Sequence, residues 1–242
     1  MRKECITFYV LRFKLMLTPE DFFELKDFAH RDIFADIEYV WDALKCLPEY
    51  IESTIKPGIY GTVHDGACLI GDKIRIGKGS VVEPGAYIAG PTIIGENTVI
   101  RHGAYVRGNV IIGDHCVVGH TSEVKGSILL DRGNAPHFNY VGDSILGNNS
   151  NLGAGTKLSN LKITKGSVTV KIADKIYDSG LRKFGAIIGD RAETGCNSVL
   201  NPGTLIGPGS LVYPNATVTG YVPPDSIVKL RQTLEIVYSS PA

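Results

Sequence analysis

Large β-branched residues recur at every sixth position through the middle of the chain. Consecutive positions at this spacing hold Ile70, Ile76, Val82, Ile88, Ile94, Ile100, Val106, Ile112, Val118 and Val124. With 43% of the residues hydrophobic, such a run of apolar residues at fixed spacing arises by chance at about two in ten thousand starting points. The period of six therefore indicates a structural repeat.

Small residues keep the same period. Four positions after the large residue come Ser80, Ala86, Thr92, Thr98, Ala104, Cys116 and Ser122, and glycine directly follows several large residues, as at Gly77, Gly95, Gly113 and Gly119. The pattern resumes at Leu146, Leu152 and Leu158, and again at Ile188, Thr194, Leu200, Ile206, Val212 and Val218. We expect the glycines to supply positive φ at corners. We expect Cys68 and Cys116, both in the small-residue position, to be buried packing thiols.

Neither a helix nor an ordinary strand has a period of six. A coil of three short strands does, because three repeats make a coil of about 18 residues, and stacked coils form three parallel sheets around a narrow core. The sequence therefore predicts an all-β parallel β-helix over residues 58–228. This pattern resembles the left-handed parallel β-helix of the hexapeptide-repeat family, which implies left-handed coils here.

Residues 1–57 differ from the repeat and are predicted to be mainly helical. Thr18-Pro19-Glu20-Asp21 has the character of a helix start, with a capping hydroxyl, proline in the first turn and acidic residues next. We expect two helices that end before Pro57 and cover an open end of the β-helix, where strand edges are unpaired. Residues 1–15 either form an extra strand or precede a translation start at Met16.

Residues 161–182 interrupt the later coils. They alternate apolar and polar side chains, which predicts a projecting β-hairpin with Gly166-Ser167 or Asp174-Lys175 at a turn. Residues 229–242 form a C-terminal tail.

Composition and charge exclude several classes of protein. The 25 basic and 25 acidic residues cancel, so electrostatics favours neither nucleic acid nor an anionic membrane as a partner. The five cysteines contain no CxxC pair, as expected of reduced thiols inside a cell. No apolar stretch has the length of a membrane span, and Arg12 and Lys14 interrupt the apolar start, which makes it a poor signal peptide. We therefore expect a cytoplasmic protein.

The longest failure of the repeat, residues 130–140, is expected to form an out-of-register loop that carries polar and aromatic groups. His137-Phe-Asn-Tyr140-Val-Gly142-Asp143 is followed by Gly147, Asn151 and Gly153-Ala154-Gly155-Thr156. This block resembles the acetyltransferase domain of the bifunctional N-acetylglucosamine-1-phosphate uridyltransferase/glucosamine-1-phosphate acetyltransferase family. The resemblance extends over roughly residues 60 to 228.

The resemblance implies transfer of acetyl from acetyl-CoA to an amino-sugar 1-phosphate, with glucosamine 1-phosphate the leading acceptor, in UDP-N-acetylglucosamine or related sugar-nucleotide biosynthesis. Histidine is the usual general base near neutral pH, so His137 is the expected base and Glu123 is expected to orient it. Arg107 and Lys125 lie 18 residues apart, so they should stack on one face and bind phosphate. The remaining implied acceptor contacts are Tyr140, Asn151, Asn160 and Lys183.

The resemblance also implies how the coenzyme is bound. The Ala154 N–H is expected to contact the thioester oxygen. Cys196 stands where the family usually has a serine, and Lys229 or Arg231 is expected near the coenzyme phosphates. The family is homotrimeric, its Lys183 equivalent reaches a neighbouring subunit's site, and its acetyl transfer requires no metal. Nothing before residue 58 resembles the family's nucleotidyltransferase domain, so we expect no uridyltransferase activity.

Three alternatives remain open from the sequence. His115, His120 and His102 have spacings that suggest a zinc carbonic anhydrase of the same fold, but Gly79 occupies the position of a needed third ligand. A non-catalytic oligomerisation or regulatory module of a sugar-nucleotide pathway is the second alternative. Acetylation of a nucleotide-linked amino sugar is the third.

Overall fold

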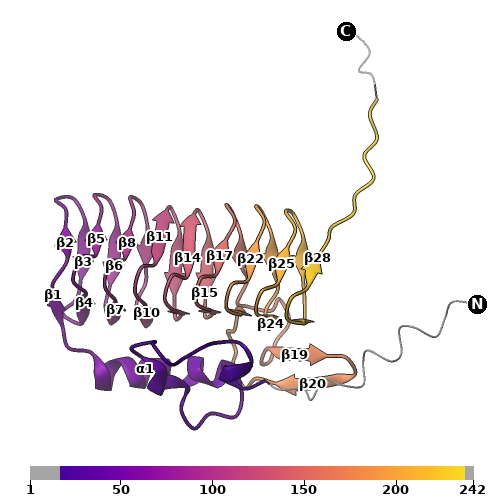
Figure 1. Ribbon diagram of the computed structural model, residues 1–242, viewed down its shortest axis with the longest axis horizontal. Helices are drawn as coiled ribbons and strands as arrows, with labels where there is room; N and C mark the ends of the chain where they lie inside the picture. Colours follow the sequence, from indigo (N-terminus) through magenta and orange to yellow (C-terminus); the bar gives the residue numbers. More distant parts are fainter. Residues whose placement is uncertain (1–16, 238–242) are drawn as a thin grey trace, which may run out of the picture.

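The computed structural model describes residues 17–237. The expectations about residues 1–15 and a start at Met16 therefore lie outside the described residues. The chain winds into a left-handed parallel β-helix, with coils stacked in sequence order as a triangular prism (Figure 1). The predicted all-β fold is confirmed.

Three parallel sheets form the sides of the prism. Sheet A contains, in spatial order, β1 (Gly58–Ile59), β4 (Ile74–Ile76), β7 (Thr92–Ile94), β10 (Val110–Ile112), β13 (Ile128–Leu129), β16 (Ile145–Leu146), β21 (Ala186–Ile188), β24 (Thr204–Ile206) and β27 (Tyr221–Val222). Sheet B contains β2 (Thr62–Val63), β5 (Val81–Val82), β8 (Val99–Ile100), β11 (Val117–His120), β14 (Asn134–His137), β17 (Asn151–Leu152), β22 (Glu193–Thr194), β25 (Leu211–Val212) and β28 (Ile227–Val228). Sheet C contains β3 (Cys68–Ile70), β6 (Tyr87–Ala89), β9 (Tyr105–Val106), β12 (Glu123–Lys125), β15 (Tyr140–Gly142), β18 (Lys157–Leu158), β23 (Val199–Leu200) and β26 (Thr217–Val218).

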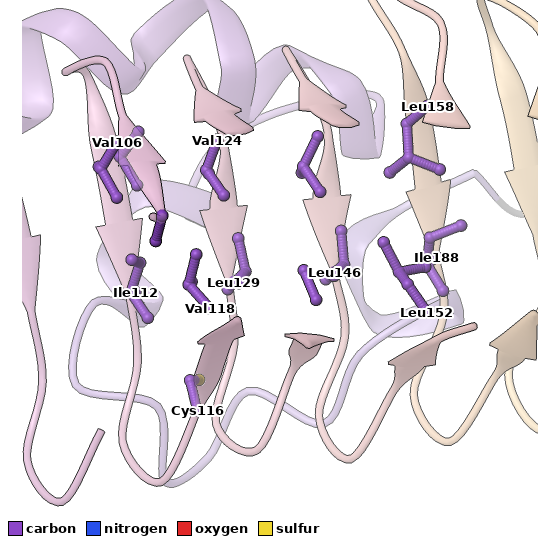
Figure 2. Packing of buried hydrophobic residues seen from close by; sticks show 14 of the residues in the cluster. Val106, Ile112, Cys116, Val118, Val124, Leu129, Leu146, Leu152, Leu158 and Ile188 are labelled. Atoms are coloured by element: carbon purple, nitrogen blue, oxygen red, sulfur yellow. The ribbon is translucent and has the colours of Figure 1, made fainter. Parts of the chain in front are cut away.

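The period-six residues fill the interior of the prism from Ile76 onward, as predicted. Figure 2 shows these side chains pointing inward from successive coils. The first coil differs, because Leu69 aligns with Ile88 and Ile70 is 49% exposed. Cys68 precedes the inward Leu69, so it faces outward and is exposed. The prediction that Cys68 is buried is wrong, whereas Cys116 is buried as predicted.

The glycines that follow the inward residues serve the close approach of neighbouring coils. A Cβ on Gly77 would lie 2.3 Å from the carbonyl oxygen of Gly95, and one on Gly119 would lie 1.6 Å from that of Pro136. Positive φ occurs instead three positions after an inward residue, as at Gly79 (φ 73°). The prediction that Gly77 and its equivalents supply positive φ is therefore wrong.

Residues 130–140 continue the coil instead of leaving it as a loop. Strand β14 pairs in register with β11, where Ala135 lies opposite Val118 and takes the inward position. The phase of the repeat changes because the turn from sheet C to sheet A loses a residue: Leu129, not the sixth residue after Val124, is the next to face inward. Gly126 adopts a φ of 54° at this shortened turn. The prediction of an out-of-register loop is wrong.

The N-terminal segment lies along the side of the prism, not over its end (Figure 1). It contains single 3₁₀ turns η2 (Pro19–Asp21), η3 (Arg31–Phe34) and η4 (Val40–Asp42), followed by helix α1 (Ala43–Thr54). The predicted cap is present, because the N–H and Oγ1 of Thr18 both donate to Asp21 Oδ2 at 2.9 Å, but it starts one turn only.

Sheet A explains why the segment lies there. Its outward residues are also apolar, and the N-terminal segment and inserted hairpin bury them: Ile93, Ile111, Ile128, Ile145, Ile187 and Leu205. Parallel strands that are apolar on both faces require cover on both faces. The prediction that the helices cover an open end is therefore wrong.

The insertion forms the predicted β-hairpin, with β19 (Thr169–Ile172) antiparallel to β20 (Lys175–Asp178). Its two-residue turn is Ala173-Asp174, since Ile172 pairs with Lys175. The hairpin does not project, because Val168, Val170 and Ile172 are buried in the same cluster as the N-terminal segment. None of the helices within residues 17–237 has the length and apolar character needed to cross a bilayer.

Candidate functional site

The outer face of sheet C carries two charged rows. Because Val124 faces inward, Glu123 and Lys125 on either side of it face outward. Val124 lies opposite Val106 on β9, so Arg107 and Lys125 are neighbours across adjacent strands. Their predicted position on one face is confirmed.

Each of these cations is paired with a carboxylate. Arg107 Nη1 lies 2.7 Å from Glu123 Oε1, with side chains 43% and 30% exposed, and the Glu123 hydrogen bond and charge raise the pKa of Arg107. Lys125 Nζ lies 2.6 Å from Asp143 Oδ2. A guanidinium has five N–H donors and an ammonium three, so both groups keep donors for an anionic ligand.

Asp143 ends the His137–Asp143 segment of the resembling block, and its role becomes visible only in the structure. Besides Lys125 it accepts a hydrogen bond from Asn160 Nδ2, and Asn160 is 8% exposed. Its sequence signal was its place 18 residues after Lys125, in the next coil and directly after Gly142, which lies opposite Lys125. Asp143 therefore ties Lys125 and Asn160, two predicted acceptor contacts, into one network.

Tyr140 lies beside this network. Tyr140 is opposite Glu123 on the adjacent strand, and a Cβ on Gly142 would lie 2.7 Å from both the Tyr140 hydroxyl and Asn160 Nδ2. Gly142 is therefore needed for the two polar groups to meet. Burial, followed by the negative charges of Glu123 and Asp143, raises the pKa of Tyr140, so its hydroxyl remains a donor at neutral pH.

His137 ends β14 at the corner between sheets B and C, and its side chain is exposed. Its backbone N–H donates to Asn139 Oδ1 at 3.0 Å, and Asn139 Nδ2 donates to the Gly153 carbonyl at 2.8 Å. A buried Asn139 thus holds the backbone of His137 and leaves the ring at the surface. Within residues 17–237 the Glu123 carboxylate bonds to Arg107 and not to the His137 ring, so its orienting role stays a prediction.

The same corner carries the predicted coenzyme contacts in the following coils. The Gly155 N–H donates to the His137 carbonyl at 3.0 Å, and the Asn197 N–H donates to the Ala154 carbonyl at 2.8 Å. Cys196 is therefore one coil beyond Ala154, which is one coil beyond His137. Lys229 directly follows β28, in register with Tyr213 beside this series, with Nζ 5.9 Å from the Tyr213 ring centroid, and Arg231 follows in the exposed tail.

Of two further predicted residues, one lies away from these groups and the other lies at their edge. Asn151 faces outward from sheet B, where it lines a cavity with His115, Val117, Arg132, Asn134, Asn149 and Glu193. Lys183 is exposed and bridges to Leu161 between sheets C and A. A single chain therefore does not bring Asn151 to the groups on sheet C, whereas the Lys183 backbone lies next to Asn160, whose carbonyl accepts from the Phe184 N–H at 2.9 Å.

The histidines of the carbonic anhydrase alternative are divided between corners. The rings of His102 and His120 stack at the corner between sheets B and C, with centroids 5.8 Å apart. His115 instead lines the cavity on sheet B. No group of three or more His, Cys, Asp or Glu side chains suited to a metal ion occurs in the described part of the chain.

Comparison with known proteins gives matches over the repeat region. Residues 88–179 match the family described as the GMPPB C-terminal domain. The bifunctional protein GlmU of Methanococcus maripaludis (strain DSM 14266) is 36% identical over 201 residues, which are 83% of this chain and 48% of that protein. The bifunctional sugar-1-phosphate nucleotidylyltransferase/acetyltransferase of Sulfurisphaera tokodaii is 40% identical over 90 residues, 37% of this chain and 22% of that protein.

The chain thus spans about half or less of these relatives. Among solved structures, the UDP-N-acetylglucosamine acyltransferase of Francisella novicida superposes with a TM-score of 0.53 at 17% identity, covering 70% of this chain and 66% of that one. At this identity the likeness is one of fold.

Proposed function

Because the chain belongs to the hexapeptide-repeat acyltransferase family, we propose that it transfers an acetyl group from acetyl-CoA to the amine of an amino sugar phosphorylated at its anomeric carbon. Glucosamine 1-phosphate is the simplest such acceptor, and its product supplies sugar-nucleotide synthesis. The observation that carries the proposal is the shared corner on which His137, Ala154 and Cys196 follow one another coil by coil.

The chemistry needs a base and an oxyanion donor close together. An amino sugar is mostly ammonium at neutral pH, and it has no lone pair until a proton leaves. We assign His137 as the base, since its imidazole is exposed at this corner and a neutral imidazole nitrogen can accept a proton. One proton leaves the ammonium for solvent, and the freed nitrogen attacks the thioester carbonyl carbon. His137 then takes the second proton that the nitrogen must lose, the C–S bond breaks, and His137 passes this proton to the departing thiolate.

The Ala154 amide is the assigned donor to the thioester oxygen. It lies in the turn one coil beyond His137, between Gly153 and Gly155. Within the described residues its N–H takes part in none of the hydrogen bonds. A free amide aimed at the position where negative charge develops lowers the barrier to attack.

The acceptor phosphate is assigned to Arg107 and Lys125, with the Tyr140 hydroxyl as a further donor. Both cations hold a carboxylate partner, so the phosphate takes the donors that the carboxylates leave free. The Arg107 side chain, 43% exposed, has room for this second partner. Asn160 Nδ2 donates to Asp143 and lies beside the Tyr140 hydroxyl, so Asn160 is assigned as a further acceptor contact.

We further propose that the protein is a homotrimer whose sites lie between copies. The N-terminal segment and hairpin cover the outer face of sheet A, which leaves sheets B and C free for contact between copies. Asn151 on sheet B and Tyr140 on sheet C cannot reach one ligand within a chain. Sheet B of a second copy facing sheet C brings Asn151 to the acceptor, and Lys183 is assigned to a neighbour's site.

The test is thiol release from acetyl-CoA with glucosamine 1-phosphate. We expect wild type to turn over, and His137→Ala to lose about 10²- to 10⁴-fold in kcat. His120→Ala is the matched control, because His120 is exposed and lies one coil before His137 on the same corner. Equal rates for His137→Ala and wild type exclude His137 as the base. An acetyl-CoA titration that leaves the melting temperature unchanged favours a non-catalytic module instead.

A further inference from the structure

Two exposed tyrosines lie on the outer face of sheet C, in the row of outward residues that also contains Glu123 and Tyr140. Tyr87 and Tyr105 lie opposite each other on β6 and β9, and the row continues through Glu123 to Tyr140. Their side chains are 36% and 42% exposed. Their ring centroids are 5.2 Å apart with the planes at 75°. An exposed aromatic pair beside two cations needs an explanation.

The second row of the same face complements the first. Val106 lies opposite Ile88, so Ala89 precedes Arg107 and Lys125 in this row, and Gly142 follows them opposite Lys125. The two cations are therefore flanked by residues with little or no side chain. The Arg107 guanidinium also lies 5.7 Å from the Tyr105 ring centroid, which joins the aromatic and cationic groups.

These dimensions suit a ligand with an anionic part and a flat part. Neighbouring strands are about 5 Å apart, so Tyr87 lies one strand from Arg107 and two from Lys125, roughly 5 to 10 Å along the face. The base and the second phosphate of a nucleoside diphosphate are separated by a distance of the same order. Nucleobases stack on exposed aromatic rings, and arginine beside the ring strengthens the contact.

We propose that Tyr87 and Tyr105 form a stacking surface for a nucleobase, so that the preferred acceptor is an amino sugar carried on a nucleoside diphosphate. This inference rests on the proposed acetyl transfer and extends its phosphate site toward the first coils. Because the two ring planes stand at 75°, one ring offers its face to the base and the other borders it. Glu123 on one side and Cys68 on the other flank the pair and limit the stacking surface to two adjacent rings, as expected for a small ligand.

The experiment compares two acceptors and two variants of the full chain. Acetyl transfer is measured with glucosamine 1-phosphate and with glucosamine linked to uridine diphosphate. The variants are Tyr87→Ala/Tyr105→Ala and the control Tyr60→Ala, whose ring is 59% exposed and lies under the Arg75 guanidinium at 4.9 Å. Binding of uridine diphosphate and of inorganic diphosphate is measured by calorimetry without acetyl-CoA.

We expect wild type to favour the nucleotide-linked acceptor and to bind uridine diphosphate more tightly than diphosphate. The double variant is expected to lose about 5- to 150-fold in kcat/KM for the nucleotide-linked acceptor, with little change for glucosamine 1-phosphate and none in Tyr60→Ala.

Equal losses with both acceptors overturn the inference, and so does a wild type that binds both diphosphates equally. The inference is also overturned if the double variant has a sedimentation coefficient different from that of wild type, because the tyrosines are then contacts between copies. If neither acceptor turns over but the tyrosines still govern uridine diphosphate binding, the stacking surface stands and the proposed acetyl transfer fails.

Discussion

Glu123 has two competing roles, and Glu123→Gln separates them. The residue was expected to orient His137, yet its carboxylate accepts a hydrogen bond from Arg107 at 2.7 Å. If its role is to hold Arg107, the substitution removes a negative charge beside the acceptor phosphate. Glutamine keeps the length and an acceptor oxygen, so Arg107 retains its position. We therefore expect tighter binding of the phosphorylated acceptor.

The exposure of the pair sets the size of this effect. The Arg107 and Glu123 side chains are 43% and 30% exposed, so solvent screens their interaction. Exposed ion pairs contribute about 0.2 to 1 kcal/mol, which corresponds to a fall in the acceptor KM of about 1.4- to 5-fold. The value of kcat should stay close to that of wild type, and the effect should shrink as salt is added.

Initial rates of thiol release across acceptor concentrations give kcat and KM separately. Glu52→Gln is the matched control, because Glu52 pairs with Lys73 at a similarly exposed position away from the site. A large fall in kcat, with an altered pH profile and an unchanged KM, refutes the reasoning. That result assigns Glu123 to the imidazole of His137 instead.

Three further predictions concern the scaffold. Burial raises the pKa of the Cys116 thiol to about 12. Iodoacetamide at pH 8 should therefore leave Cys116 of the native protein unmodified while it alkylates exposed Cys46. Equal labelling of the two cysteines in mass spectrometry contradicts this. Gly119→Ala places a Cβ 1.6 Å from a backbone oxygen of the next coil. The substitution should lower the free energy of unfolding, measured by urea titration, by about 3 kcal/mol or more. A urea midpoint equal to that of wild type refutes the close approach of the two coils. Phe184→Ala empties a fully buried position whose ring centroid lies 6.1 Å from that of Trp41. It should lower the free energy of unfolding by about 3–5 kcal/mol, followed through the fluorescence of the single tryptophan. A loss of stability below about 1 kcal/mol contradicts this packing.

The interior of the prism was readable from the sequence because its contacts repeat. Each inward residue packs against its equivalents one coil away, so Ile76 and its successors follow one spacing. The same spacing predicted that Arg107 and Lys125 share a face. Spacing alone missed the shortened turn at Gly126, where one lost residue moves every later inward position.

The cover of sheet A needed the tertiary structure, although a sequence signal exists. Adjacent apolar pairs such as Ile93-Ile94 and Ile111-Ile112 occur on the strands of sheet A, one residue facing inward and the other outward. A six-residue period counts the inward member and does not say what covers the outward one. That depends on where residues far away in sequence fold back, as the N-terminal segment and hairpin do.

The candidate site divides in the same way. The sequence by itself determined which residue types are present and which of them share a row of the prism. Only the tertiary structure decided that Asn151 faces a different side from Tyr140, that Glu123 bonds Arg107, and that His137 and Ala154 share a corner. The reason is that turn lengths choose the side on which a residue emerges, and side-chain rotamers choose its partner.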